Sequence, residues 1–285
     1  TPPGRWTPSA RAPCLIATHC EDTPTINANL ARFRAQYGDN IAPDAHPLIR
    51  SREACIKSTL LAMELARKHD ARLHVLHITT AEELALFAPG DSQGKRITAE
   101  TCLHFLHFDR RDYARKGNLI KCNPAIKDPA DREALLEAVK DGRIDVLATD
   151  HAPHVPSEKG AQYDKAAAGL PLVQFAVPLV LERFHDGVFD LPLIVEKIAH
   201  SPARMFGVRE RGFLREGYHA DLVLVDLDRE QLVRREDVLN RCGWSPFEGD
   251  SFRSTIVATW VNGHLAYRDG QLDDRILGQR LEFER

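Results

Sequence analysis

The chain has 285 residues, of which 43% are hydrophobic and 28% are charged, and its formal net charge is -3. This length allows a full buried core, and the near balance of charge excludes the strongly basic surface typical of proteins that bind nucleic acid or anionic membranes. Residues 1–13 lack the apolar core of a signal peptide, and no apolar stretch reaches the roughly 20 residues that span a bilayer. We therefore expect a cytoplasmic protein that acts on a small molecule.

The six cysteines are scattered along the chain without a CxxC pair. This spacing is typical of reduced thiols and argues against a disulfide framework or a zinc knuckle. We therefore interpret all six as structural or incidental: Cys14, Cys20, Cys55, Cys102, Cys122 and Cys242.

Strand and helix patterns alternate along the chain up to about residue 210. Short apolar runs predict strands at 14–18, 73–78, 118–122 and 144–149. Helical patterns lie between them, at 26–37, 52–69, 80–87 and 128–140, and the third begins with a capping box formed by Thr80 and Glu83. Such repetition produces parallel strands with crossover helices, either as an open doubly wound sheet or as part of a (β/α)8 barrel.

Beyond Gly212 the pattern changes to strands alone. Segments 220–226, 254–261 and 264–267 are strand-like, and Asn-Gly and Asp-Gly turn signals stand at 262–263 and 269–270. We therefore expect an α/β domain over residues 1–211 and a small β domain over residues 212–285. Residues 155–168, rich in Lys, Ala and Gly, are expected to form a flexible loop that acts as a lid.

Three predicted strands end in side chains that bind metals. His19 follows the first strand, His77 lies at the end of the second, and Asp150 follows the strand that leads into ATDHAPH at 148–154. Ligands bind beyond the carboxyl ends of parallel strands, and two imidazoles with a carboxylate suit a divalent cation such as zinc. A single histidine at a strand end is more often structural, which is our interpretation of His74, and His104 remains undecided.

Several ordered motifs together resemble the dihydroorotase family of the amidohydrolase superfamily. The resemblance runs from about residue 14 to about residue 268, and its most specific element is TDHAPH followed by AAAGLP. The other motifs are HCED at 19–22, HVLHITTAEE at 74–83, KRITAE at 95–100, KCNPAIK at 121–127, GYHADLVLVD at 217–226 and WSPFEG at 244–249.

The resemblance implies a (β/α)8 barrel and a cyclic amide hydrolase. His19, His77 and Asp150 would correspond to ligands on the fifth, sixth and eighth strands, around a centre that holds two zinc ions. Asp150 would also carry the proton in the reversible conversion of dihydroorotate to N-carbamoyl-L-aspartate, a step of pyrimidine biosynthesis.

The same resemblance assigns substrate contacts. Asn123 matches a substrate-binding position, His154 matches the residue that meets the substrate carboxylate, and Ala168 and Gly169 match a loop whose backbone groups contact the pyrimidine ring. His151 lies inside the motif without matching a ligand, so we interpret it as a supporting residue.

The chain also departs from the family pattern. The HxH pair, the substrate arginine, the asparagine and the bridging carboxylated lysine or aspartate that precede the fifth strand in relatives are absent. We therefore expect the chain to hold the C-terminal half of the barrel, with strands 5–8, and to be part of a longer polypeptide. A half barrel on its own would expose two sheet edges and its apolar interior.

Two other functions remain open. A hydantoinase or allantoinase would use the same metal centre on a different ring, although a histidine placed for a carboxylate has little purpose with a neutral hydantoin. A non-catalytic scaffold for aspartate transcarbamoylase would fit the missing HxH pair, but it has no need of Asn123, Asp150 and His154. A homodimer is also possible from the resemblance.

Overall fold

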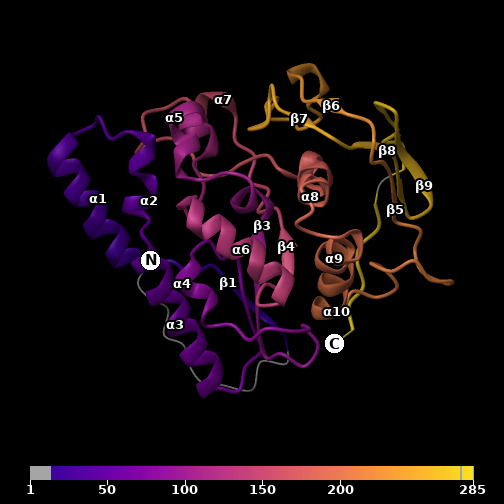
Figure 1. The fold of residues 1–285 in the computed structure, drawn as a ribbon, viewed down its shortest axis with the longest axis horizontal. Coiled ribbons are helices and arrows are strands. Elements are labelled where there is room, and N and C mark those ends of the chain that lie inside the picture. The colour runs from indigo at the N-terminus through magenta and orange to yellow at the C-terminus, as the bar shows by residue number, and fades with distance from the viewer. Residues whose placement is uncertain (1–13, 277, 285) are drawn as a thin grey trace.

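The computed structural model describes residues 14–276 and 278–284, so the prediction about a signal peptide in residues 1–13 concerns residues outside the described ones. Four short parallel strands form its central sheet, in the order of the chain (Figure 1). They are β1 (Ile16–Thr18), β2 (Leu73–Val75), β3 (Ile97–Cys102) and β4 (Val146–Ala148). Parallel pairing of consecutive strands requires a crossover between each pair, and this is the α/β class that the sequence predicts.

Helices fill the crossovers and continue after the last parallel strand. The longest of them begin at side-chain caps, because Asp22 accepts from the Thr25 amide and Ser51 from the Ala54 amide. The helices are α1 (Thr23–Tyr37), α2 (His46–Ile49), α3 (Arg52–Lys68), α4 (Ala81–Leu84), α5 (Tyr113–Lys116), α6 (Pro129–Asp141), α7 (Pro156–Lys159), α8 (Ala176–His185), α9 (Leu191–Val195) and α10 (Ser201–Phe206). In the described part of the chain, no helix is both long and apolar enough to cross a membrane.

One predicted strand is wrong. The segment 118–122 is not a strand, because residues Gly117–Ile120 form a 3₁₀ turn, and the third parallel strand is β3 instead. The sequence of β3, ITAETC, has polar residues at Thr98, Glu100 and Thr101 and so lacks an apolar run. Its buried Thr101 hydroxyl donates a 2.7 Å hydrogen bond to the Ile78 carbonyl oxygen. Tertiary hydrogen bonding, invisible in the pattern, therefore stabilises a strand with polar residues.

The second sheet is antiparallel and comes from the end of the chain. Its order is β10-β9-β8-β5, and a separate pair, β6 and β7, lies beside it. The bounds are β5 (Leu222–Asp226), β6 (Gln231–Leu232), β7 (Ser251–Phe252), β8 (Thr255–Val261), β9 (His264–Arg268) and β10 (Gln271–Leu272). Both predicted hairpin turns are present, with positive φ at Asn262, Gly263, Asp269 and Gly270, as type I′ turns require.

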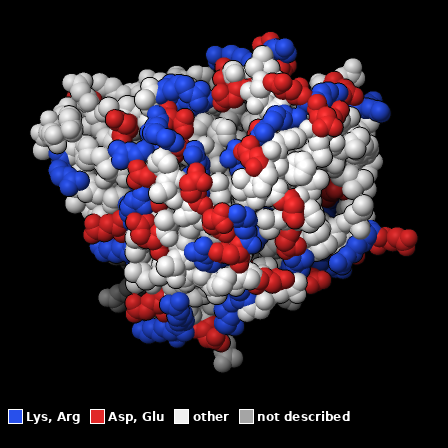
Figure 2. All heavy atoms as spheres, in the orientation of Figure 1, with Lys and Arg blue, Asp and Glu red and all other residues white. Residues whose placement is uncertain are grey.

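Helices α8, α9 and α10 lie between the two sheets (Figure 1). The main core continues from the parallel sheet through these helices to β7, where an aromatic cluster forms. The ring of Phe247 stacks on Phe108 with centroids 5.6 Å apart, and Phe252 stacks on Phe175 at 6.0 Å. On the face shown in Figure 2, acidic and basic side chains are interspersed without a patch of one sign.

Candidate active site

Three predicted ligand residues stand just beyond the carboxyl ends of parallel strands. His19 follows β1, His77 follows β2 and Asp150 follows β4. His77 has φ 43 and Asp150 has φ 47, a left-handed conformation that is uncommon for residues other than glycine. Two of the three positions therefore carry backbone strain, which clusters at functional sites.

His19 and His77 face each other directly. The Nδ1 atom of His19 lies 2.9 Å from the Nε2 atom of His77. Burial lowers the pKa of His77 to about 4, with a smaller contribution from His19, so its imidazole is neutral near pH 7. Neutral imidazole is the form that binds metals, and two nitrogens on one tetrahedral zinc ion stand roughly 3.3 Å apart at zinc–nitrogen distances of about 2.0 to 2.1 Å. The observed 2.9 Å is a hydrogen-bond distance, so a shared cation would require the two rings to move slightly apart.

Glu21 and Arg50 hold His19 in place, and neither role was predicted. The buried Glu21 carboxylate lies 3.1 Å from the Nε2 atom of His19 and accepts a hydrogen bond from Arg50. Burial alone would raise the pKa of Glu21, but the hydrogen bond from His19 and the charge of Arg50 lower it overall. A carboxylate on the outer nitrogen of a histidine is the usual support of a metal ligand. The HCED motif contained this signal.

Asp150 is near this pair but does not complete a ligand cluster. Burial raises the pKa of the Asp150 carboxyl, although the charge of His19 opposes the change. Within residues 14–276 and 278–284, no group of three or more His, Cys, Asp or Glu side chains is close enough to hold a metal ion. The structure thus brings two of the three predicted ligands together, and Asp150 forms no ligand cluster with them among the described residues.

Asn123 lies in the loop between the 3₁₀ turn Gly117–Ile120 and α6, and not at a strand end as predicted. Its Oδ1 atom is buried and has no hydrogen-bond partner among the described residues. A buried acceptor without a partner is costly, so a ligand that donates a hydrogen bond would satisfy it. The unpartnered Oδ1 atom supports a contact with substrate, because a residue that only forms a turn before Pro124 would not need a buried free acceptor.

His154 is held through its backbone by a residue far along the chain. The indole Nε1 of Trp244 donates a 2.7 Å hydrogen bond to the His154 carbonyl oxygen. The imidazole Nδ1 lies 3.2 Å from a carboxylate oxygen of Glu158 on α7. The His154 imidazole thus already contacts a carboxylate, that of Glu158. Trp244 lies in the WSPFEG motif, to which no role was assigned from the sequence.

Ala168 and Gly169 end the loop that follows α7. Gly169 has φ 149, and a Cβ atom there would lie 2.6 Å from the Cβ of Ala152, so only glycine fits without movement. Lys159, Tyr163 and Ala166 of the same loop are buried. This packing argues against the expectation of a mobile lid, because the loop is anchored to the body of the protein.

Three other histidines take supporting places. The Nδ1 atom of His151 accepts hydrogen bonds from the Leu172 and Val173 amides at 3.0 and 3.1 Å, as expected for a supporting residue. His74 is buried and contacts Thr98 and Glu100 at 2.9 and 3.1 Å. His104 packs beside the Cys122 thiol at 3.5 Å, and burial lowers its pKa to about 3, which assigns it to the core.

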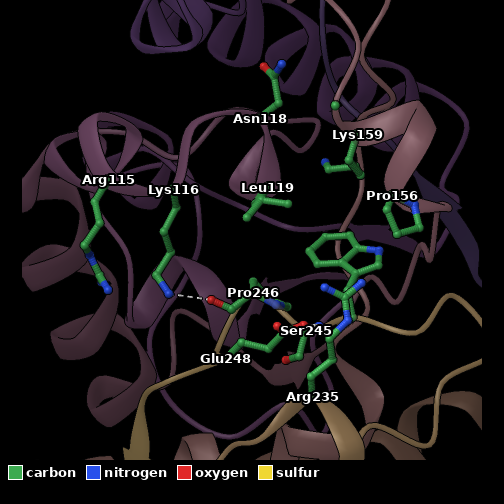
Figure 3. A pocket seen from close by; sticks show the side chains of 12 residues that line it. Arg115, Lys116, Asn118, Leu119, Pro156, Lys159, Arg235, Ser245, Pro246 and Glu248 are labelled. Atoms are coloured by element: carbon green, nitrogen blue, oxygen red, sulfur yellow. Dashed lines mark hydrogen bonds between the residues drawn. The ribbon is translucent and has the colours of Figure 1, made fainter.

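A separate cavity of about 550 Å³ opens behind the 155–169 loop (Figure 3). Lys116 and Lys159 are on its wall, with Pro246 and Arg235 opposite. The Lys116 ammonium is already bonded to the Pro246 carbonyl oxygen at 2.5 Å and to Asp250 at 3.1 Å. The buried charge of the cavity is therefore satisfied within the protein.

Solved structures share this fold. An L-hydantoinase from Arthrobacter aurescens superposes with a TM-score of 0.85 at 25% identity, covering 94% of this chain and 60% of the hydantoinase. A structure of D-hydantoinase superposes with a TM-score of 0.82, covering 90% of this chain. The predicted barrel fold with an added small β part is thereby confirmed.

Sequence relatives agree with the structural ones. The chain is 34% identical to a dihydroorotase of Halobacterium salinarum over 82% of this chain, and 33% identical to a dihydroorotase of Bacillus subtilis over 90%. It spans 53% and 59% of the lengths of these two relatives. The model of the amidohydrolase family matches residues 14–266. The chain, with its histidine pair at the ends of β1 and β2, belongs to the amidohydrolase family.

Proposed function

We propose that this chain forms part of the active site of a dihydroorotase, which interconverts dihydroorotate and N-carbamoyl-L-aspartate. The observation that carries the proposal is the approach of His19 to His77 at 2.9 Å, beyond the carboxyl ends of two neighbouring parallel strands. The similarity to several dihydroorotases at 30% to 35% identity supports this choice within the family.

We propose that His19, His77 and Asp150 hold zinc, with two ions per site in the complete protein. The donor set fits a cation, because His77 is neutral and His19 is fixed by Glu21. A bound zinc ion lowers the pKa of water to about 7 and polarises a carbonyl group.

Asp150 would move the proton. Water adds to the ring carbonyl carbon and the bond from that carbon to the amide nitrogen breaks, so one proton must pass from the water to the leaving nitrogen. Burial raises the pKa of Asp150, which brings the carboxylate closer to the pH at which it accepts and returns a proton efficiently. The reverse direction closes the ring through the same group.

Three elements would hold the substrate. The unpartnered Oδ1 of Asn123 would accept a hydrogen bond from a ring N–H, and His154 would meet the substrate carboxylate. The backbone at Ala168 and Gly169 would contact the pyrimidine ring.

A hydantoinase is the competing function, and the superposition on the L-hydantoinase of Arthrobacter aurescens favours it. Turnover of dihydroorotate, hydantoin and allantoin by the purified protein, in the longest form that its gene encodes, separates the two. We expect ring opening of dihydroorotate, whereas activity on hydantoin or allantoin alone would contradict the proposal.

The scaffold alternative has a different signature. A non-catalytic partner of aspartate transcarbamoylase would copurify with that enzyme and would show neither bound zinc nor turnover. Metal analysis of the same preparation, together with its mass in solution alone and with aspartate transcarbamoylase, tests this alternative and the proposed homodimer.

A further inference from the structure

Two buried lysines stand behind the loop that ends at Gly169. Lys159 is 1% exposed and Lys121 is 7% exposed. Lysine is almost never fully buried without a partner of opposite charge. Within the described residues, however, neither ammonium forms a salt bridge with a carboxylate, and both bond to backbone carbonyl oxygens only.

These bonds all reach the loop or Lys121, which directly follows the 3₁₀ turn Gly117–Ile120. The Lys159 ammonium donates to the carbonyl oxygens of Lys121, Ala167 and Gly169, each at 3.0 Å, which uses all three of its protons. The Lys121 ammonium donates to the carbonyl oxygens of Tyr163 and Ala166, each at 2.5 Å. We call Lys121 and Lys159 the lysine clamp.

The clamp holds its charge at neutral pH. Burial lowers the pKa of each lysine to about 8, so both remain largely protonated at pH 7. In Figure 3 the Lys159 side chain is one of those that line the cavity, and its ammonium also lies 5.8 Å from the ring centre of Trp244. Burying two ammonium groups costs desolvation free energy, which suggests that these lysines have a function. A methionine of similar length would fill the same space without that cost.

Lys159 determines the orientation of the peptide group between Ala167 and Ala168. In a trans peptide the carbonyl and the next N–H point in opposite directions. Because Lys159 draws the Ala167 carbonyl inward, the N–H of Ala168 is turned to the other side of the loop. That N–H has no hydrogen-bond acceptor among the described residues, whereas the Gly169 N–H donates to the Lys121 carbonyl at 2.9 Å.

We propose that Lys159, assisted by Lys121, is a positioning residue that turns the N–H of Ala168 toward a carbonyl oxygen of the substrate ring. This inference rests on the proposed function for the identity of the substrate. The role of the clamp in holding the loop is independent of that identity. Lys159 itself touches no substrate.

The test is Lys159→Met in the longest form that the gene encodes, compared with Lys165→Met. Lys165 is an exposed lysine of the same loop and serves as the matched control. We expect Lys159→Met to lower hydrogen-exchange protection across 160–170 and to raise the KM for dihydroorotate by about 10-fold. The kcat should change by less than about threefold, because the reacting groups are untouched. Lys165→Met should change neither quantity.

Each outcome decides one claim. Unchanged loop protection and unchanged KM in Lys159→Met would overturn the clamp. If that variant does not fold, Lys121→Met takes its place and should loosen 163–166; failure of both variants to fold would also overturn a local positioning role. If the unmodified protein does not turn over dihydroorotate, the proposed function fails, while the exchange comparison still decides whether Lys159 holds the loop.

Discussion

The Nδ1 atom of His19 lies 2.9 Å from the Nε2 atom of His77, although 58 residues separate them in the chain. We predict that His77→Asn removes bound metal and lowers kcat/KM by at least about 100-fold, since a ligand nitrogen is lost. Asparagine is the suitable replacement because it tolerates the φ of 43 at this position. Elemental analysis and kinetics measure the two effects.

His69→Asn is the control for this prediction. His69 ends α3 outside the site, so the variant should keep both metal and activity. Full metal content in His77→Asn would rule out His77 as a ligand.

Asp150→Asn should separate proton transfer from folding. The substitution keeps the size of the side chain and suits the φ of 47, but it removes the proton acceptor. We expect kcat to fall by about 10² to 10⁴-fold while the melting temperature stays nearly constant. A kcat within about 10-fold of the unmodified enzyme would mean that another group carries the proton.

Gly169→Ala should displace the loop end. The new Cβ would lie 2.6 Å from both the Cβ and the carbonyl oxygen of Ala152, at a φ of 149 that alanine avoids. We expect a destabilisation of about 1 to 3 kcal/mol and a higher KM for dihydroorotate, measured by urea unfolding and steady-state kinetics. Gly160→Ala, at a φ of -80 in the same loop, is the control and should keep the KM near its original value.

Buried histidines should make the fold sensitive to acid. Burial, with a smaller contribution from Arg183, lowers the pKa of His107 to about 4, and burial lowers that of His46 well below its usual value. Both groups take up protons more readily when unfolded, near pH 6.5, so their contribution to stability is complete above that pH and is lost as the pH falls below it.

The expected loss is on the order of 1 kcal/mol per pH unit for each histidine between pH 6.5 and about pH 4.5. Urea unfolding at a series of pH values, with a chelator present so that metal release adds nothing, measures the slope. His107→Gln should flatten it, and an identical slope in that variant would contradict the assignment.

The sequence predicts the α/β class and both hairpin turns because these depend on local signals. Periodic apolar residues mark the helices, and Asn262-Gly263 adopts the positive φ values that its turn needs. Strand β3 was not predicted because its stability depends on residues distant in the chain. The Thr101 hydroxyl donates a hydrogen bond to the Ile78 carbonyl, 23 residues away. Local patterns carry no information about such partners.

In the candidate site, too, local signals could be predicted and contacts between distant residues could not. His19 and Asp150 could be found because a polar residue after an apolar strand is a local signal. Lys121 and Lys159 could not, because lysine in a loop is normally exposed, and only the fold reveals the carbonyl oxygens that surround their ammonium groups. Trp244 was equally hidden, since its hydrogen-bond partner is 90 residues away.

Contacts of residues 231–252 with the α/β part determine which segments can be exchanged with those of a related protein in a chimaera. Trp244 bonds to the His154 carbonyl, Gln174 bonds to the Asp237 carbonyl at 2.7 Å, and Lys116 bonds to the Pro246 carbonyl at 2.5 Å. A chimaera joined at residue 211 would replace one side of each contact and leave the other. Residues 231–252 must therefore be inherited together with the segments that hold Lys116, His154 and Gln174.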